Sequence, residues 1–233
     1  MDTFSRLHEG LRQVLAHRIG WSELRAVQEK AYEAVSGGND VLVIAPTAGG
    51  KTEAALIPVV DGILKGGFSG VAALYLAPLK ALINDQEDRF SSFCLPTGLE
   101  VLKWHGDVPK GDRAWKDNEP PHILMITPES LEVLLMEREL SLGLANLRYL
   151  IIDELHAFVE SERGVQMRVL IDRLDRISGR KIQRIGLSAT VGNPEEILSW
   201  LSGSRHGEVL VRISAPPQPK RFTFVVEEKE SAR

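Results

Sequence analysis

Apolar residues along the chain form two kinds of segment, which alternate from about residue 41 onward. Short apolar runs predict buried β-strands, and longer segments with apolar positions at helical spacing predict helices. The predicted strands are residues 41–44, 71–76, 101–104, 123–126, 147–152, 184–187 and 209–213. The predicted helices between them are residues 51–64, 80–92, 129–136, 164–177 and 195–201. This alternation predicts an α/β fold with a mostly parallel central sheet and helices on both faces, which is a three-layer arrangement.

The chain before the first strand is predicted to be helical. Apolar positions at helical spacing run over residues 4–17, and a second helix is predicted over residues 23–35. Ser22 is the expected N-cap of this second helix, and the glycine pair after it is the expected stop. We assign these helices, residues 1–38, to the same domain as the sheet.

The end of the chain differs in composition from the rest. Residues 214–219 read Ser-Ala-Pro-Pro-Gln-Pro, which is incompatible with a helix, and the residues after 226 are mostly charged. We therefore expect residues 39–213 to form the body of the domain. Residues 214–233 are expected to form a linker that leaves it.

The residues that directly follow the predicted strands are mostly small or polar. They are Ala45–Thr52, Ala77–Lys80, His105–Asp107, Thr127–Ser130, Asp153–His156 and Ser188–Thr190. The carboxyl ends of parallel strands meet at one edge of a sheet, and ligands bind there in α/β folds. These segments are therefore expected to lie along a single edge and to form the functional site.

The segment after the first strand predicts a phosphate-binding loop. It reads Ala-Pro-Thr-Ala-Gly-Gly-Lys-Thr and opens a predicted helix. The free N–H groups and positive dipole of a helix start attract phosphates, and small residues let those amides approach. Lys51 would add positive charge at the β- and γ-phosphates, and the Thr52 hydroxyl would bind Mg²⁺. Ala45 stands where the strict pattern has Gly, and an ordinary strand–helix turn is the alternative.

An acidic pair follows the strand at residues 147–152. Asp153 is expected to hold Mg²⁺ through water, and Glu154 to orient and deprotonate an attacking water. Lys51, the metal charge and the loop amides would stabilise charge on the transferring phosphoryl group. A solvated acidic turn is the alternative. For His156 we prefer a hydrogen bond to Ser188 or Thr190 over a role as metal ligand or general base.

Composition narrows the class of protein. With 233 residues, of which 43% are hydrophobic and 26% charged, the chain has the composition of a soluble globular protein. The formal net charge is −4 at pH 7, so nucleic-acid contacts would need a local patch or backbone amides. The only cysteine, Cys94, excludes an intramolecular disulfide and fits a reducing compartment. The sequence has no signal-like N-terminus and no apolar run of membrane length, so we expect a cytoplasmic protein without a membrane partner.

Taken together, these segments resemble the first RecA-like domain of a superfamily-two helicase of the DExH type. The resemblance covers roughly residues 4–213. The matching segments are Gly20–Gln28 for the Q motif, Ala45–Thr52 for motif I, Ala77–Leu82 for motif Ia, Thr127–Leu131 for motif Ib, Asp153–His156 for the DExH box and Ser188–Thr190 for motif III. Gly106-Asp107, Pro120–Leu124 and Arg163-Gly164 are similar to the large-helicase-related (Lhr-like) branch.

The resemblance implies ATP and Mg²⁺ as cofactors in a P-loop site. Adenine is expected against Gln28 and either Trp21 or Phe4. The residues implied in cofactor binding are Trp21, Arg25, Gln28, Thr47, Ala48, Gly49, Gly50, Lys51, Thr52 and Glu53. Catalysis is assigned to Lys51, Asp153 and Glu154, metal binding to Thr52 and Asp153, and coupling of hydrolysis to strand separation to His156, Ser188 and Thr190. Ala48 and Gly49 replace the commoner Gly-Ser, and we expect little effect.

Motifs Ia and Ib are implied to hold one nucleic-acid strand by its phosphates. Thr127 as N-cap and Pro128 at the first position would begin a helix whose amides can bind a phosphate. The full set of expected contacts is Pro78, Lys80, Gly106, Thr127, Pro128, Ser130 and Arg163. Lys80 and Arg163 could instead be solvated charges, and Glu129 is expected to face away or to serve the cap. Such contacts would be independent of base sequence and sensitive to salt.

The remaining aromatic residues and the cysteine have simpler interpretations. Trp104 and Trp200 are predicted core residues, and Cys94 is a predicted buried small residue. Trp21 is either core or next to adenine. Trp115 lies in a charged stretch and could be exposed and stack on a base, although this is the weaker interpretation.

The function expected from this resemblance is the ATP-binding domain of an ATP-dependent helicase or translocase, acting on DNA rather than RNA. Helicases of this superfamily need a second RecA-like domain, which supplies arginines to the ATP site. After Thr190 only about forty residues remain, too few for such a domain. We therefore expect a piece of a longer protein, with weak ATP binding, little ATPase activity and no unwinding by itself. The alternatives are a P-loop ATPase or kinase unrelated to nucleic acid, and a nucleic-acid-binding module without hydrolysis.

Overall fold

The computed structural model describes residues 2–45, 49–107, 119–159, 161–189, 192–203 and 208–212, with only the backbone of Arg212. Several sequence predictions fall outside these ranges. They concern Thr47, Ala48, Trp115, Thr190 and the linker at residues 214–233.

The described residues contain one seven-stranded sheet. Its strands are β1 (Asp40–Ile44), β2 (Ala73–Leu76), β3 (Val101–Trp104), β4 (Ile123–Ile126), β5 (Tyr149–Ile152), β6 (Gln183–Ser188) and β7 (Glu208–Arg212). The order across the sheet is β3-β4-β2-β5-β6-β1-β7, and every neighbouring pair is parallel. The central strands are buried on both faces, which explains their continuous apolar runs.

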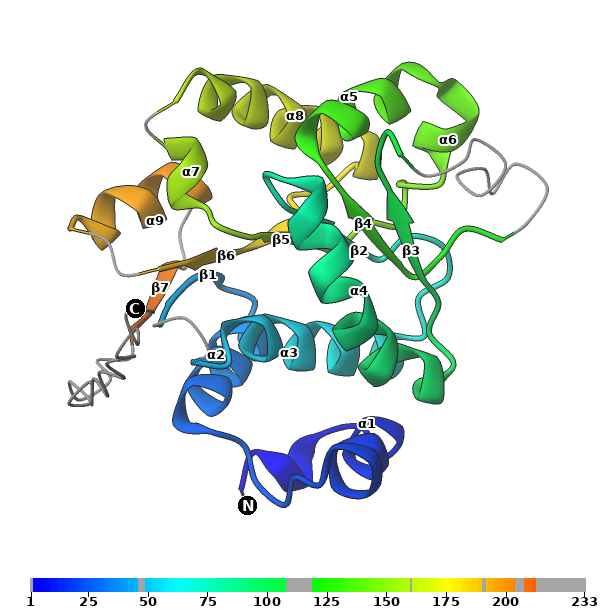
Figure 1. Cartoon of the computed structure of the whole chain (residues 1–233), viewed down its shortest axis with the longest axis vertical. Helices are drawn as coiled ribbons and strands as arrows, with labels where there is room; N and C mark the ends of the chain where they lie inside the picture. Colours follow the sequence, from blue (N-terminus) through cyan, green and yellow to red (C-terminus); the bar gives the residue numbers. More distant parts are fainter. Residues whose placement is uncertain are drawn as a thin grey trace, which may run out of the picture.

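Helices cover both faces of the sheet, as Figure 1 shows. The α-helices are α1 (Glu9–Val14), α2 (Ala26–Ser36), α3 (Lys51–Gly66), α4 (Lys80–Cys94), α5 (Pro128–Met136), α6 (Arg138–Leu142), α7 (His156–Val159), α8 (Glu162–Ser178) and α9 (Pro194–Ser202). The shorter helical turns are η1 (Phe4–Arg6), η2 (Leu15–Ile19) and η3 (Leu95–Thr97). Helices α1 to α4 lie on one side of the sheet and α5 to α9 on the other. Each of the two groups of helices shares one buried apolar cluster with its face of the sheet. The predicted α/β class and its three layers are confirmed.

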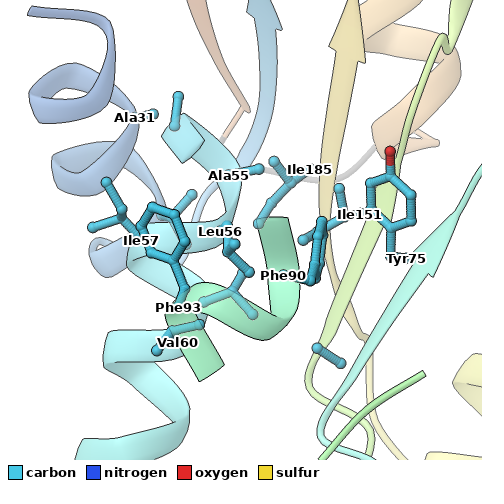
Figure 2. Close-up of a cluster of buried hydrophobic side chains, with 14 of the residues drawn as sticks. Ala31, Ala55, Leu56, Ile57, Val60, Tyr75, Phe90, Phe93, Ile151 and Ile185 are labelled. Atoms are coloured by element: carbon cyan, nitrogen blue, oxygen red, sulfur yellow. The ribbon is translucent and has the colours of Figure 1, made fainter. Parts of the chain in front are cut away.

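The cluster under α1 to α4 also joins the N-terminal helices to the sheet. Leu11 and Tyr32 belong to the same buried cluster as Val41 and Val43 of β1. Figure 2 shows the part of this cluster where α3 and α4 face the strands, with Phe90 between Leu56 and Ile151. The N-terminal helices therefore share a core with the sheet.

The prediction of one helix over residues 4–17 is wrong. The chain forms η1, then α1, then the π-helical turn η2. His8 interrupts the helix with an extended ψ of 137°. Its N–H donates to Asp61 Oδ1 at 2.6 Å, and its ring accepts the N–H of Gly10 at 3.2 Å. A carboxylate on α3 thus replaces the intrahelical partner, which the local pattern of apolar residues does not reveal.

Ser22 is not the N-cap that the sequence suggested. Helix α2 begins at Ala26, and Arg25 is its N-cap. The side chain of Gln28 reaches back and accepts the backbone N–H of Arg25 at 2.9 Å. This bond satisfies an N–H at the helix start. The N-cap is therefore three residues later in the chain than the predicted N-cap, Ser22.

The predictions for Cys94 and Trp104 are confirmed, since both side chains are buried. Burial raises the pKa of the Cys94 thiol to about 12, so this cysteine is expected to be unreactive at neutral pH. Trp200 is only partly buried, and it packs against the second cluster beneath the Arg168 guanidinium at 5.6 Å. The prediction that Trp200 is a core residue is therefore only partly confirmed.

Within the described residues, none of the helices combines the length and the apolar composition needed to cross a lipid bilayer.

Candidate functional site

The predicted segments lie along one edge of the sheet. Since all strands are parallel, their carboxyl ends point the same way, and the register pairs Ile44 with Ser188, Gly186 with Ile152 and Leu76 with Ile126. The segments after β1, β6 and β5 are therefore neighbours, followed by those after β2, β4 and β3. Neighbouring strands are about 4.8 Å apart, so β1 and β5 lie roughly 10 Å apart across β6. The prediction that Lys51 and Asp153 share one sheet edge is confirmed.

Helix α3 starts at this edge with Lys51. Its N-cap, Gly50, has φ 79° and ψ 27°, a left-handed conformation that glycine adopts without strain. Lys51 is half-buried, and Thr52 is 9% exposed. The N–H groups of the first turn have no partner within the helix, so this end of α3 suits an anion.

Gly50 also joins the Q-like segment to the phosphate-binding loop. A Cβ atom at Gly50 would lie 3.3 Å from Gln28 Nε2, 3.6 Å from Arg25 Nη1 and 3.8 Å from Glu53 Oε2. Residues that the sequence assigned to ATP binding from two separate segments are thus neighbours in space. Side chains larger than glycine's hydrogen would crowd them.

Two buried polar atoms beside Gly50 have no hydrogen-bond partner among the described residues. They are Nε2 of Gln28, whose side chain is 1% exposed, and Oε2 of Glu53. Gln28 Oε1 is already bonded to Arg25, and Glu53 Oε1 lies 3.3 Å from Arg89 Nη1. One donor and one acceptor therefore remain, and buried groups of this kind need partners. The ring nitrogens and amino group of a purine offer the complementary pair.

Trp21 packs against the core next to this cluster. Its ring meets Phe93 edge-on with centroids 6.2 Å apart, and the Arg25 guanidinium lies 6.0 Å from it. Phe4 also packs against the same buried cluster. Trp21 therefore makes the core contacts that were its alternative interpretation, and the contact of either aromatic residue with adenine stays a prediction.

Asp153 directly follows β5, and its N–H and both of its carboxylate oxygens are hydrogen-bonded. It is 6% exposed, and its N–H donates to Leu76 O at 2.8 Å. Its Oδ1 accepts the N–H of Glu154 at 2.9 Å, and its Oδ2 accepts the Tyr75 hydroxyl. Glu154 then turns the chain sharply with φ 46°, a left-handed value unusual for a residue other than glycine. Backbone strain of this kind clusters at functional sites.

His156 connects the ends of β5 and β6. Its Nδ1 lies 3.1 Å from Ser188 Oγ and 3.4 Å from Glu154 Oε2. Ser188 is fully buried, whereas Glu154 and His156 are partly open to solvent. The predicted hydrogen bond between His156 and Ser188 is confirmed. It forms a continuous polar link from the acidic pair to the neighbouring strand.

Sequence reasoning missed Tyr75 as a partner of Asp153. Tyr75 lies within the apolar run of β2, and the pattern predicts only that it belongs to a buried strand. The signal that could have found it is its hydroxyl, because a buried tyrosine O–H needs a hydrogen-bond partner. Which partner it finds depends on the pairing of β2 with β5.

Helix α5 begins at the same edge, directly after β4. Thr127 is its N-cap, with Oγ1 accepting the Ser130 N–H at 3.4 Å and donating to Ser130 Oγ at 3.1 Å, and Pro128 occupies the first turn. The predicted cap is confirmed. Because Pro128 has no N–H and the Ser130 and Leu131 N–H groups bond to Thr127, the first turn leaves the Glu129 N–H beside the sheet edge.

Removal of the cap is expected to destabilise the fold. Thr127→Ala should lower the free energy of unfolding by about 1 kcal/mol, because the Ser130 N–H loses its acceptor. Urea denaturation followed by circular dichroism measures this change. Thr127→Ser keeps the oxygen and serves as the control. Equal stability of Thr127→Ala and the parent chain would contradict the capping role.

Arg163 is paired rather than free. Its Nη2 donates to the Pro78 carbonyl at 2.9 Å and to Glu129 Oε1 at 2.7 Å, and its guanidinium lies 5.4 Å from the Phe158 ring. Glu129 does not serve the cap, because Thr127 does and the Glu129 carboxylate pairs with Arg163. One side chain of α8 thus ties the Pro78 segment to the start of α5.

Lys80 lies in an exposed ion pair at the same end of the edge. Its Nζ is 2.8 Å from Asp107 Oδ1, with 47% and 71% of the two side chains exposed. A Cβ atom at Gly106 would lie 3.2 Å from Lys80 Nζ, so Gly106 leaves room for the ammonium group. Exposed pairs of this kind contribute little stability, and an incoming phosphate can replace the carboxylate.

Comparison with known proteins places the chain among helicases. The sequence model of the DEAD/DEAH box helicase family matches residues 25–197. The chain is 36% identical over 217 residues to "Lhr helicase/ probable uracil glycosylase" of Mycolicibacterium smegmatis, which covers 86% of this chain and 14% of the relative. It is 32% identical over 225 residues to "ATP-dependent helicase Lhr-Core" of Methanothermobacter thermautotrophicus, covering 89% of this chain and 26% of the relative. The chain thus spans a minor part of the relatives that it matches.

Solved structures agree with this assignment. The structure of Mycobacterium smegmatis helicase Lhr bound to ssDNA and AMP-PNP matches with a TM-score of 0.81 and 34% identity, covering 95% of this chain and 29% of that one. The helicase MrfA bound to DNA and AMPPNP matches with a TM-score of 0.77 and 28% identity, covering 91% and 30%. The fold is that of a RecA-like helicase domain, as predicted. The helicase interpretation is supported over that of a P-loop ATPase unrelated to nucleic acid.

The family model matches most of the chain, the Lhr relatives are similar over most of it, and the motif segments lie along one sheet edge. The chain therefore belongs to the DEAD/DEAH box helicase family.

Proposed function

We propose that the chain binds ATP with Mg²⁺ at the ends of β1, β6 and β5, and holds a single DNA strand at the ends of β2, β4 and β3. In the full-length protein, hydrolysis of ATP drives movement along that strand. One observation carries the proposal: the two sets of segments follow adjacent strands of the same sheet edge. The relative from M. smegmatis is described as bound to ssDNA and AMP-PNP, which supports it.

At the ATP end, the amides that open α3 and the ammonium group of Lys51 bind the phosphates. Gln28 Nε2 and Glu53 Oε2 supply the unpaired donor and acceptor for the base or sugar, next to Gly49, Gly50 and Arg25. Thr47 and Ala48 complete the loop in this proposal. Such a site discriminates among nucleotides, because a wrong base leaves buried polar atoms unpaired.

The residues present fit a magnesium ion. Thr52 and Asp153 offer a hydroxyl and a carboxylate, both nearly buried, and Mg²⁺ prefers such hard oxygen ligands. Each Asp153 oxygen accepts one hydrogen bond and retains a further acceptor site for a metal-bound water. When bound, Mg²⁺ neutralises charge that develops on the β- and γ-phosphate oxygens.

Glu154 is the proposed general base. Its carboxylate takes the proton of the water that attacks the γ-phosphate. His156 lies within 3.4 Å of this carboxylate and bonds to Ser188, so it orients Glu154 and links the reaction to β6. Together with Thr190, these residues would couple ATP hydrolysis to strand separation in the full-length protein.

At the DNA end, phosphates bind to the start of α5 through Thr127, Pro128 and Ser130, and to Lys80 beside Gly106. Arg163 contributes by fixing the Pro78 segment next to α5. These contacts involve backbone and charge, so binding would be independent of base sequence.

We also propose where the domain begins and ends and in which compartment the protein acts. Residues 1–38 and 39–213 would act as one ATP-binding domain, and residues 214–233 as the connection to a second RecA-like domain that completes the ATP site. The relatives are several times longer than this chain, which leaves room for such a domain in them. We place the protein in the cytoplasm.

A titration of labelled single-stranded DNA tests the function. The full-length protein is expected to bind the strand at low salt, with an affinity that changes when AMP-PNP and Mg²⁺ are added. Nucleotide binding without any strand binding would favour the ATPase that does not act on nucleic acid. Strand binding without hydrolysis would favour the module that has lost catalysis.

Lys80→Ala is expected to weaken DNA binding equally for all sequences. Loss of one phosphate contact should reduce the slope of log affinity against log salt by about 1. Fluorescence anisotropy over a range of salt concentrations measures the slope. Lys30→Ala, which removes an exposed lysine from α2, is the matched control. An unchanged slope in Lys80→Ala would remove Lys80 from the interface.

A further inference from the structure

Tyr75 is a fully buried polar side chain that the proposed ATP site does not yet use. It lies in β2 within the cluster under α1 to α4, and its ring meets Phe90 edge-on with centroids 4.8 Å apart. Figure 2 shows it next to Phe90 and Ile151, with its hydroxyl pointing away from the labelled apolar side chains. Because a buried phenol rarely lacks a hydrogen-bond partner, the direction of this hydroxyl needs an explanation.

The sheet register places that hydroxyl at Asp153. Tyr75 pairs with Ile151 across β2 and β5, and residues two apart along a strand face the same side. Asp153 therefore follows Ile151 on the Tyr75 side, and the hydroxyl donates to Asp153 Oδ2. The contact joins the interior of one strand to the end of the next.

This bond fixes the second oxygen of the Asp153 carboxylate. The first oxygen accepts the Glu154 N–H at 2.9 Å. With both oxygens engaged, rotation about the Cβ–Cγ bond breaks at least one hydrogen bond. A tyrosine phenol is protonated at physiological pH, so the Tyr75 hydroxyl is a donor to this carboxylate.

We propose that Tyr75 is a positioning residue for magnesium binding: its hydroxyl holds the Asp153 carboxylate in the orientation that accepts the metal's water. The inference rests on the proposed function, in which Asp153 binds Mg²⁺. Partners that orient a metal-binding side chain typically contribute 10- to 100-fold to metal affinity. If Tyr75 were only a core residue, its ring would contribute to stability and loss of its hydroxyl would leave the Mg²⁺ affinity unchanged.

Tyr75→Phe tests this distinction because it removes one oxygen and keeps the ring on Phe90. In the full-length protein, binding of a fluorescent, non-hydrolysable ATP analogue is titrated with Mg²⁺. The Mg²⁺ concentration for half-saturation is expected to rise about 10- to 100-fold, while affinity for the analogue without Mg²⁺ stays unchanged. Excess Mg²⁺ should restore ATP turnover.

Tyr32→Phe is the matched control. Its hydroxyl donates to Asp61 Oδ2 at 2.9 Å, so it removes the same kind of buried tyrosine–aspartate bond between α2 and α3. Its Mg²⁺ dependence is expected to equal that of the parent protein. Urea denaturation of both variants separates a loss of stability from a loss of metal affinity.

The outcomes distinguish the two proposals. Wild-type Mg²⁺ dependence in Tyr75→Phe overturns the positioning role and leaves the ATP site intact. If the parent protein itself binds the analogue in no Mg²⁺-dependent way, the proposed function fails instead. Should Tyr75→Phe not fold, 3-fluorotyrosine at position 75 keeps the hydroxyl. Its ¹⁹F resonance is expected to shift on adding Mg²⁺ to the nucleotide complex, and the absence of a shift overturns the inference.

Discussion

Glu154→Gln is expected to abolish ATP turnover and to leave nucleotide binding intact. The amide is nearly the same size as the carboxylate but cannot take a proton from the attacking water. Loss of a general base typically costs 10²- to 10⁴-fold in rate, so turnover should fall by at least about 100-fold. Steady-state phosphate release by the full-length protein, with saturating single-stranded DNA, measures this loss. Titration with a fluorescent ATP analogue measures binding.

The control for this variant is Glu195→Gln, which makes the same exchange at an exposed position near the start of α9. It should leave turnover unchanged. If Glu154→Gln retains the turnover of the parent protein, Glu154 is not the base. The hydrogen bond of His156 to Ser188 would then need another function.

Lys51→Ala is expected to reduce both binding and turnover. The ammonium group stands at the first residue of α3, where it adds to the positive end of the helix dipole. In the proposed site its charge would act on the phosphates in the ground state and more strongly in the transition state. Removing one such electrostatic contact at a reacting group costs about 10²- to 10³-fold in rate. Calorimetric titration with AMP-PNP and assays of turnover measure the two effects.

Lys181→Ala provides the comparison for Lys51→Ala, because Lys181 is exposed just before β6, at the opposite edge of the sheet. It should bind and hydrolyse ATP normally. Lys51→Arg retains the charge on a longer, planar group and is expected to recover binding better than turnover. Normal ATP affinity in Lys51→Ala would place the triphosphate elsewhere on the molecule.

The strands and the edge on which the site lies were predictable from the sequence. Strands buried on both faces read as continuous apolar runs, and the small or polar residues after them mark the carboxyl ends. The cap at Thr127 was predictable because capping is local. The break at His8 was not, since its N–H is taken by Asp61, which lies 53 residues further along the chain.

The contacts inside the site were less accessible to sequence reasoning. The pairing of Arg163 with Glu129 depends on how α8 packs beside α5, and the pairing of Tyr75 with Asp153 depends on strand order. Apolar periodicity determines which face a residue occupies within its own element, but it does not say which element lies next to it. Motif spacing therefore brought the candidate catalytic residues to one edge of the sheet, and it missed the side chains that contact them.

The contacts of Arg163 have a consequence for the movement along DNA that we propose for the full-length protein. Because one guanidinium nitrogen bonds to both the Pro78 carbonyl and the Glu129 carboxylate, the two segments that we propose to bind phosphates are joined by one side chain and are expected to shift together. The spacing between the phosphates that they hold would then stay constant throughout a cycle of hydrolysis. Any advance of the strand would have to come from a change of distance between this domain and a neighbouring one.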